Sequence, residues 1–529
     1  MIDDTREDPV CRVTPAQLAS SIDKISKHTT SRHLAQSWAR RLRFLTFDDD
    51  AASEIVPTVS HEKRLLCGGC ESGQRIPPGH HCYSHEQSLR TANLESETIA
   101  ATANACRHIT HLACSYCRTI PLFPTRKKAT RFRIRRVVQK DADMGMGTFD
   151  PKSYREFPCG HFVAVSYCWS SQPPASDSDG DVDAGPYMVV EEDGSVREAR
   201  ASKHTIDRAV AFAAQNGYRM IWIDQECIPQ DDPAEKEVGI QAMDIVYLSA
   251  HITIGLFETT LEQRHMDALF GTTTARHVAE ALSLVPRGKL PAARRQPQVL
   301  EFGNVAETLE LVVGDRWNTR AWILQEAFAS AGSIVMLLPK SNRVRVHDFG
   351  LLCHEKAPSS EICVDFHVLF TCLKLAANII ERARPDGNTL AQTLHKVSWL
   401  HPEFPRVSMV EWSIGGSKQR DTCSAATALA FLRYRENTVV SDRLAIIANM
   451  CGYEKRLDTV GLGNSGNVSS LAVCVLALSI MNGDFSLLTP ELHYRELCAP
   501  LPAEAGDGTG ASTFCNVALP NNPTPAQRY

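Results

Sequence analysis

The sequence predicts an α/β protein with a central parallel sheet, an irregular N-terminal region that contains cysteine and histidine, and a mainly helical C-terminal domain. Two observations support this fold class. Short runs rich in β-branched residues alternate with segments of helical periodicity between residues 162 and 338. These runs are apolar on both sides, which is typical of parallel strands that helices cover on both faces.

The central elements alternate along the chain. Strands are expected at residues 162–167, 220–223, 252–257 and 334–338, and helices at residues 203–217, from Pro233 onward and at 316–329. Gly217 marks the end of the first of these helices. Asp232 is an expected N-cap, Pro233 suits the first turn, and Glu235 completes a capping-box arrangement. The Pro-, Ser-, Asp- and Gly-rich residues 170–199 predict a surface loop.

The flanking regions have different patterns. Helices are expected at residues 15–26 and 32–45, and a strand with alternating arginines at residues 131–135. This strand is interpreted as a solvated edge strand, with binding of an anion or acidic partner as the alternative. After residue 338 the periodicity is mainly helical. The expected division is an N-terminal region, an α/β domain, a helical domain and a loose tail at residues 1–145, 146–340, 341–502 and 503–529.

Composition limits the class of protein. Apolar residues make up 43% and charged residues 22% of the chain, values that are ordinary for a soluble globular protein. The net charge of −5 favours neither nucleic acid nor an anionic membrane as a partner. The N-terminus is acidic rather than signal-like, and the apolar run at residues 471–481 is too short for a transmembrane segment. We therefore expect a cytoplasmic protein whose 18 cysteines are mostly reduced.

Polar residues follow two of the expected strands. Ser166 and Trp169 come at the end of the first, and Trp222 and Asp224 at the end of the second. In an open parallel sheet, ligands collect at the carboxyl ends of the strands. These side chains are therefore candidate binding residues, although acids at a strand end also occur in solvated loops.

Two helices add candidates whose roles the spacing leaves open. Glu237, Gln241 and Asp244 form a polar stripe on the helix that begins at Pro233, either a cleft wall or, as the periodicity favours, a solvent edge. Arg320 can hold carboxylates or phosphates, or it can pair with Glu326 or Asp224 to stabilise the fold.

Cysteines and histidines gather in the N-terminal region. Cys67 with Cys70 and Cys114 with Cys117 form a Cys-x-x-Cys pair that can supply four ligands to tetrahedral zinc. The alternative is a set of unrelated reduced thiols. A nucleophilic pair of Cys168 or Cys227 with His161 or His251 is a further alternative, although a thiol that follows a buried strand is more often an inert core residue.

Three ordered blocks carry a resemblance to a known family: FVAVSYCW at 162–169, MIWIDQECIPQDDPAEKEVGIQAMDIVY at 220–247 and RAWILQE at 320–326. Together they resemble the signature blocks of the fungal heterokaryon-incompatibility (HET) domain. Pro229 and Ser170 stand where that family often has Asn and Gly. The matching residues are Ala164, Ser166, Tyr167, Trp169, Trp222, Ile223, Asp224, Cys227, Ile228, Gln230, Glu237, Gln241, Met243, Arg320, Trp322, Gln325 and Glu326.

The resemblance implies a role in fungal non-self recognition, where HET-domain proteins trigger growth arrest and cell death through protein partners and self-association. It also implies a flavodoxin-like sheet similar to the TIR domain, some members of which cleave NAD+ with a glutamate on a helix. By that analogy Glu237 is the catalytic candidate, and NAD+ is the candidate substrate. Asp224, Ser166, Gln241 and Glu326 become candidate binding residues, with Trp222 or Trp169 stacking on a ring and Arg320 meeting the phosphates. The rival expectation is a non-enzymatic signalling scaffold that acts by domain assembly.

Overall fold

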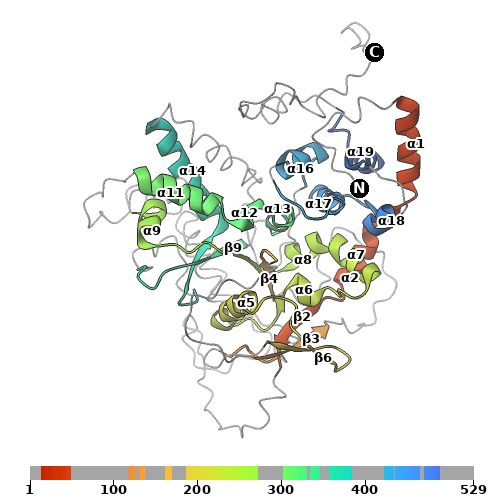
Figure 1. Ribbon diagram of the computed structural model, residues 1–529. Coiled ribbons are helices and arrows are strands. Elements are labelled where there is room, and N and C mark those ends of the chain that lie inside the picture. The colour runs from red at the N-terminus through yellow and green to blue at the C-terminus, as the bar shows by residue number, and fades with distance from the viewer. Residues whose placement is uncertain are drawn as a thin grey trace, which may run out of the picture.

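Figure 1 shows the computed structural model of the chain. The structure describes twelve parts of the chain. These are residues 14–48, 117, 120–124, 130–136, 161–169, 186–271, 302–330, 334–345, 357–383, 422–433, 435–464 and 470–488.

Four parallel strands form the centre of the main sheet. They are β4 (Val163–Ser166), β7 (Ile221–Trp222), β8 (Ile252–Leu256) and β9 (Ile334–Pro339). β4 lies between β7 and β8, and β9 lies beyond β8, with parallel pairing throughout. The expected central strands and their parallel arrangement are confirmed.

The sheet is larger and more mixed than the sequence indicated. In the described residues it has nine strands, in the order β10-β9-β8-β4-β7-β2-β3-β5-β6. β2 and β10 pair antiparallel with β7 and β9, so antiparallel strands flank the parallel centre on both sides. The added strands are β2 (Arg43–Phe47), β3 (Arg131–Arg136), β5 (Met188–Val190), β6 (Val196–Glu198) and β10 (Glu361–Asp365).

Two local expectations change as a result. The helix expected at residues 32–45 ends early, because α2 covers Arg32–Ala39 and the chain then enters β2. The arginine-rich strand β3 exists, but it lies between β2 and β5 and is therefore not an edge strand. Its arginines are held by acids: Asp48 lies 2.8 Å from Arg131 and 3.0 Å from Arg133.

Helices cover both faces of the parallel centre. In β4 the side chains of Val163 and Val165 face one way, into a core shared with α5 (Lys203–Asn216). Phe162 and Ala164 face the other way, into a core with residues of α8 (Met243–Ser249). Strands buried on both faces need apolar residues at successive positions, which explains the unbroken apolar runs in the sequence.

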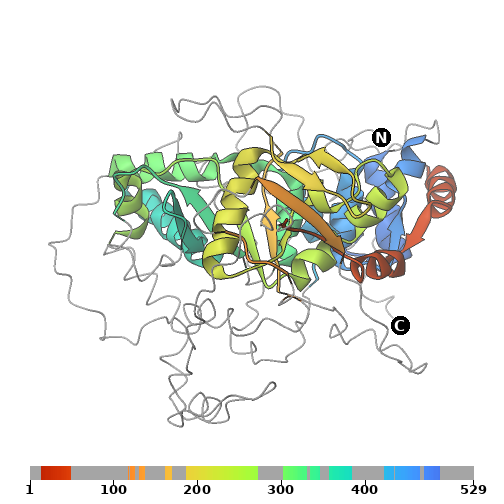
Figure 2. The same cartoon turned by 90° about the horizontal axis from the view of Figure 1, so that it is seen from below.

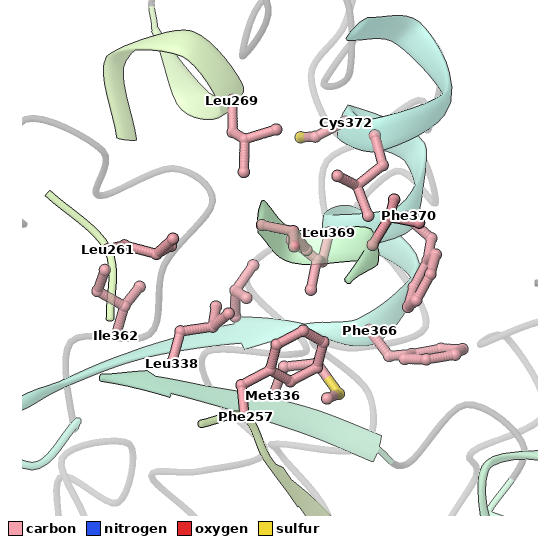
Figure 3. Close-up of a cluster of buried hydrophobic side chains, with 14 of the residues drawn as sticks. Phe257, Leu261, Leu269, Met336, Leu338, Ile362, Phe366, Leu369, Phe370 and Cys372 are labelled. Carbon is pink, nitrogen blue, oxygen red and sulfur yellow. The ribbon is translucent and has the colours of Figure 1, made fainter. Parts of the chain in front are cut away.

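One end of the sheet packs against three helices: α9 (Gln263–Phe270), α11 (Phe302–Val313) and α14 (Phe366–Ala383). Figure 3 shows side chains of α14, including Phe366, Leu369 and Phe370, above Met336 and Leu338 of β9. This apolar cluster contains no site candidate apart from Cys168.

On the opposite side of the molecule, the C-terminal helices gather with the N-terminal helix (Figure 2). α1 (Pro15–Ser26) packs against α19, and α13 (Ala321–Ala329) packs against α17. A short two-stranded sheet of β1 (Thr29–Ser31) and β11 (Lys455–Leu457) joins the two ends of the described chain. The C-terminal helices are α16 (Ala425–Leu432), α17 (Asp442–Cys451), α18 (Thr459–Asn464) and α19 (Leu471–Met481). Within the described part of the chain, no helix combines the length and apolar character that a membrane span needs.

Candidate functional site

The carboxyl ends of β4 and β7 bring three of the motif residues together. Trp169 donates from Nε1 to Oδ2 of Asp224 over 2.8 Å, and the Tyr167 hydroxyl donates to Oδ1 over 2.9 Å. Asp224 is the first residue of α6 (Asp224–Cys227), which starts directly after β7. Strand-end residues from the two strands are therefore in direct contact.

Burial is the largest influence on the pKa of Asp224. It raises the pKa of this carboxyl, and hydrogen bonds from Tyr167, the Gln225 backbone and Trp169 oppose the rise. Trp169, which donates to it, is 41% exposed, so part of this residue is open to solvent. The pair presents an aromatic surface beside a shielded carboxylate.

A second polar group lies deeper, where α13 meets β4. Glu326 is 4% exposed and Ser166 is fully buried. Burial raises the pKa of Glu326 to about 8, and hydrogen bonding with Ser166 and Tyr247 opposes the shift. Oε2 of Glu326 and both amide atoms of the neighbouring Gln325 have no hydrogen-bond partner among the described residues. Glu326 is thus an acid that stays largely protonated at neutral pH.

Trp317 fixes the position of Ser166. Its Nε1 donates to the Ser166 hydroxyl over 3.1 Å and to the Ser166 carbonyl over 3.2 Å. The opposing residue in β8 is Gly255, where an added Cβ would come within 3.1 Å of the Trp317 ring and 2.4 Å of Met336. A glycine at this strand position therefore leaves room for the side chains of Met336 and Trp317.

Arg320 supplies positive charge near the same strand ends. It is partly exposed, and its Nη1 has a long contact of 3.5 Å to the Thr438 hydroxyl. Its charge lowers the pKa of Glu326, although burial dominates. Arg316 and Arg320 also lower the pKa of Cys168, but burial raises that pKa to about 12, so the thiol is not a ready nucleophile.

Trp222 is placed differently from Trp169. It is fully buried and meets the Tyr247 ring edge-on at 5.6 Å between centroids. Its Nε1 has no hydrogen-bond partner among the described residues. Of the two indoles proposed for stacking, Trp169 is the one that an external ring can reach.

Glu237 does not join Asp224. It lies in α7 (Pro233–Gln241), and its carboxylate accepts from the Thr459 hydroxyl at 2.8 Å and the Thr459 N–H at 3.2 Å. Gln241 also donates to it, over 3.1 Å. The carboxylate is therefore engaged with the start of α18 in the C-terminal helical region.

The polar stripe of Glu237, Gln241 and Asp244 is not the solvent edge that periodicity favoured. Gln241 is 5% exposed and Asp244 is fully buried. Arg32 donates to Asp244 over 3.0 Å, and Arg456 lies 3.8 Å from the same carboxylate. The stripe is therefore buried against the N- and C-terminal segments. No motif or spacing in the sequence indicated that arginines of these segments would lie there.

Other acids near the strand mouth are structural. Asp232 is the N-cap of α7, accepting from the Ala234 and Glu235 N–H groups, as predicted. Glu235 instead accepts from Trp38 over 3.3 Å, so the reciprocal capping-box bond is absent. Glu226 is fully buried and ion-paired with Arg197 at 2.7 Å.

Of the four proposed zinc ligands, Cys67, Cys70 and Cys114 lie outside the described residues. Cys117 is described and buried. Within the described ranges, no group of three or more His, Cys, Asp or Glu side chains is arranged to hold a metal ion. Cys227 is fully buried and its pKa is raised to about 12 by burial, in agreement with an inert core thiol.

Comparison with known proteins agrees with the motif region. Residues 162–326 match the family model described as heterokaryon incompatibility protein (HET). The matched span runs from the residue before β4 to Glu326, so it contains the candidate residues of the three motif blocks, whereas His161 and the cysteines of the N-terminal region lie outside it. No curated protein and no solved structure matches the chain.

Proposed function

We propose that this chain is an effector of fungal non-self recognition, which acts in heterokaryon incompatibility and triggers growth arrest or cell death. The HET family match over residues 162–326 supports this role. In the proposal the α/β part is TIR-like. The strand order β7-β4-β8-β9 supports this, because it corresponds to the first four strands of the flavodoxin-like order 2-1-3-4-5.

The activity that we propose is hydrolysis of NAD+ at the nicotinamide–ribose bond. The observation that carries it is the Trp169–Asp224 pair at the carboxyl ends of the parallel strands. A partly exposed indole offers a flat face to a nicotinamide or adenine ring. The adjacent carboxylate can face the positive charge that develops on the ribose as nicotinamide leaves. The bond between ribose C1′ and nitrogen breaks with its electron pair on nicotinamide, and water adds a hydroxyl to C1′ and releases a proton.

Neighbouring residues take supporting roles in this proposal. Arg320 meets the diphosphate, and Ser166 with Glu326 forms the neutral polar floor beneath the strand ends. Glu237 stays a candidate for the catalytic carboxylate, with Gln241 beside it. Catalysis by Glu237 requires that its carboxylate first break the hydrogen bonds with Thr459. We therefore assign the catalytic carboxylate to Asp224 first.

The test is NAD+ consumption by the full-length chain at high protein concentration. Asp224→Asn should reduce turnover about 100-fold or more, since it removes a charge that faces the transition state. Trp169→Phe keeps an aromatic ring and removes the N–H donor, so we expect a loss of about tenfold. The matched control is Asp231→Asn, which changes an exposed acid in the same turn, paired with Arg200, and should leave turnover unchanged.

Glu237→Gln separates the two carboxylate assignments. Loss of turnover in this variant with activity retained in Asp224→Asn would return catalysis to Glu237. Absence of turnover by the wild type, even when forced to oligomerise, would overturn the enzymatic proposal and favour the scaffold that acts by domain assembly. For the enzyme and for the scaffold alike, we propose that the protein acts in the cytoplasm, binds protein partners and self-associates.

A further inference from the structure

Two cysteines meet where α16 begins and α17 ends. Cys423 stands directly before Ser424, the N-cap of α16, and Cys451 is the last residue of α17. Both are free cysteines. A hydrogen bond with the Cys423 thiol, followed by burial, raises the pKa of Cys451 well above its usual range. The two side chains are therefore in direct contact.

The backbone also holds the two residues close together. The N–H of Cys423 donates to the carbonyl of Met450 over 3.3 Å. Because that carbonyl belongs to the peptide bond that leads into Cys451, standard bond lengths limit the Cα–Cα distance of the two cysteines to at most about 7.5 Å. Disulfides usually join Cα atoms about 4.4–6.8 Å apart. Since the two thiols also point toward each other, the pair is placed for a sulfur–sulfur bond.

Two further contacts fix this arrangement. Oδ2 of Asp484 accepts from the Ala425 N–H over 2.7 Å and from the Tyr453 hydroxyl over 2.5 Å. This carboxylate therefore links the start of α16 to the chain that leaves α17. On the other side, a Cβ built on Gly452 would lie 2.7 Å from Cγ2 of Thr422. Neighbours of both cysteines are thus packed together, so the thiol contact does not depend on one flexible side chain.

We propose that Cys423 and Cys451 form a reversible redox site, which a peroxide oxidises to a disulfide between α16 and α17. Of the cysteines that the structure describes, Cys423 alone is not buried, so it is the thiol that an oxidant reaches first. Cys451 is 8% exposed and supplies the second sulfur. Thiols in apolar cores are usually inert, whereas a partly exposed thiol beside a second thiol can be oxidised reversibly. The inference is independent of the proposed function.

The oxidation consumes one molecule of hydrogen peroxide. The Cys423 thiolate attacks one peroxide oxygen, so a sulfur–oxygen bond forms and the oxygen–oxygen bond breaks. The departing hydroxide takes up the proton that the thiol released and becomes water. The Cys451 sulfur then attacks the sulfenic acid on Cys423: the sulfur–sulfur bond forms, the sulfur–oxygen bond breaks, and the hydroxide leaves with the Cys451 proton as a second water. The two thiols lose two electrons and two protons, and the peroxide gains both. Thiol–disulfide exchange with a dithiol reverses the step.

The position of the pair gives this disulfide a structural consequence. Residues of α16 and α17 share one core with Leu324 and Phe328 of α13, the helix that carries Glu326. Oxidation therefore cross-links two helices of that core.

The experiment treats the reduced full-length wild type with hydrogen peroxide, blocks the remaining thiols and maps the peptides by mass spectrometry without a reductant. We expect a linked pair of peptides that contain Cys423 and Cys451, lighter by two hydrogen atoms than the two separate peptides. Dithiothreitol should release them. In urea the same treatment should lose most of this product, because only the fold holds the two thiols in contact. A wild type in which both cysteines stay free thiols, or in which Cys423 pairs mainly with another cysteine, would overturn the proposal.

Variants separate the roles of the two thiols. Cys451→Ser removes the second sulfur, so the sulfenic acid on Cys423 should persist and be trapped by dimedone. Cys423→Ser should leave Cys451 reduced, because Cys451 is buried. The matched control is Cys474→Ala, which changes a fully buried thiol of the same core and should leave the link intact. Oxidation of Cys451 at the wild-type rate in a folded Cys423→Ser variant would overturn the assignment of Cys423 as the thiol that meets the oxidant.

Discussion

At the scale of single residues, the buried acid Glu326 makes stability depend on pH. Its pKa is raised to about 8 by burial, above the ordinary value of 4.5. Below pH 4.5 the carboxyl is protonated in both states. As the pH rises toward 8, the unfolded chain releases this proton while the folded chain keeps it, so folding stability falls. Each pKa unit corresponds to about 1.4 kcal/mol.

Glu326→Gln should therefore remove this pH-dependent loss of folding stability. Between pH 5 and pH 8, we expect the wild type to lose about 3.5 kcal/mol more unfolding free energy than the variant. Urea unfolding of both proteins at several pH values measures this. Parallel stability profiles would contradict the assignment of a protonated Glu326. Glu258→Gln, which changes a more exposed acid near the same strand ends, serves as the control and should follow the wild type.

Single residues also show where sequence reasoning succeeds. The N-cap Asp232 was predictable because its partners, the N–H groups of Ala234 and Glu235, are neighbours in sequence. The partner of Glu237 is Thr459, 222 positions away. No local pattern encodes that contact, so periodicity alone assigned the side chain to a solvent edge.

At the scale of elements, α8 is held to the chain termini by buried charges. Asp244 accepts a hydrogen bond from Arg32 at the start of α2, and Arg456 of β11 forms an ion pair with the same carboxylate. Removing one member of a buried ion pair leaves charge without compensation and typically costs about 3–5 kcal/mol. We expect Asp244→Ala to reduce the unfolding free energy by this amount, as measured by urea unfolding.

The control pair is Asp23 of α1 with Lys27, the residue that follows this helix; the two side chains are 3.0 Å apart and mostly exposed. Asp23→Ala should change stability by less than about 1 kcal/mol, because exposed ion pairs contribute little. Equal effects of the two substitutions would mean that the arginines do not depend on Asp244. A smaller loss in Asp244→Asn than in Asp244→Ala would show how much hydrogen bonding alone contributes.

Element by element, the strands and helices with strong local signals were predictable. β4, β7, β8, β9 and α5 follow from apolar runs and from the αL glycine Gly217 that ends α5. The short strands β5 and β6 lie within residues 170–199, which were expected to be a loop, and they owe their strand state to pairing with β3 and with each other. Pairing between segments that are distant in sequence does not show in the local hydrophobic periodicity. The central strands of the sheet were therefore predicted, and the flanking strands were not.

At the scale of the whole molecule, the sheet and the cores cross the domain borders expected from the sequence. β2 and β3 come from the region before residue 145, and β10 comes from the region after residue 340. Ala321, Leu324 and Phe328 of α13 are buried in one core with the C-terminal helices. A fragment limited to residues 146–340 would expose these side chains and the edge of β7 that β2 covers.

We therefore predict that the isolated 146–340 fragment does not fold cooperatively, whereas a chain spanning residues 14–488 does. Thermal and urea unfolding compare the two, and binding of a hydrophobic dye reports the exposed apolar faces. A cooperative transition in the short fragment would show that the parallel centre is an independent domain. If the prediction holds, the NAD+ assay on the short fragment is uninformative. The full-length chain is then the form in which Asp224 and Glu237 must be compared, because the short fragment lacks Thr459, which donates a hydrogen bond to Glu237.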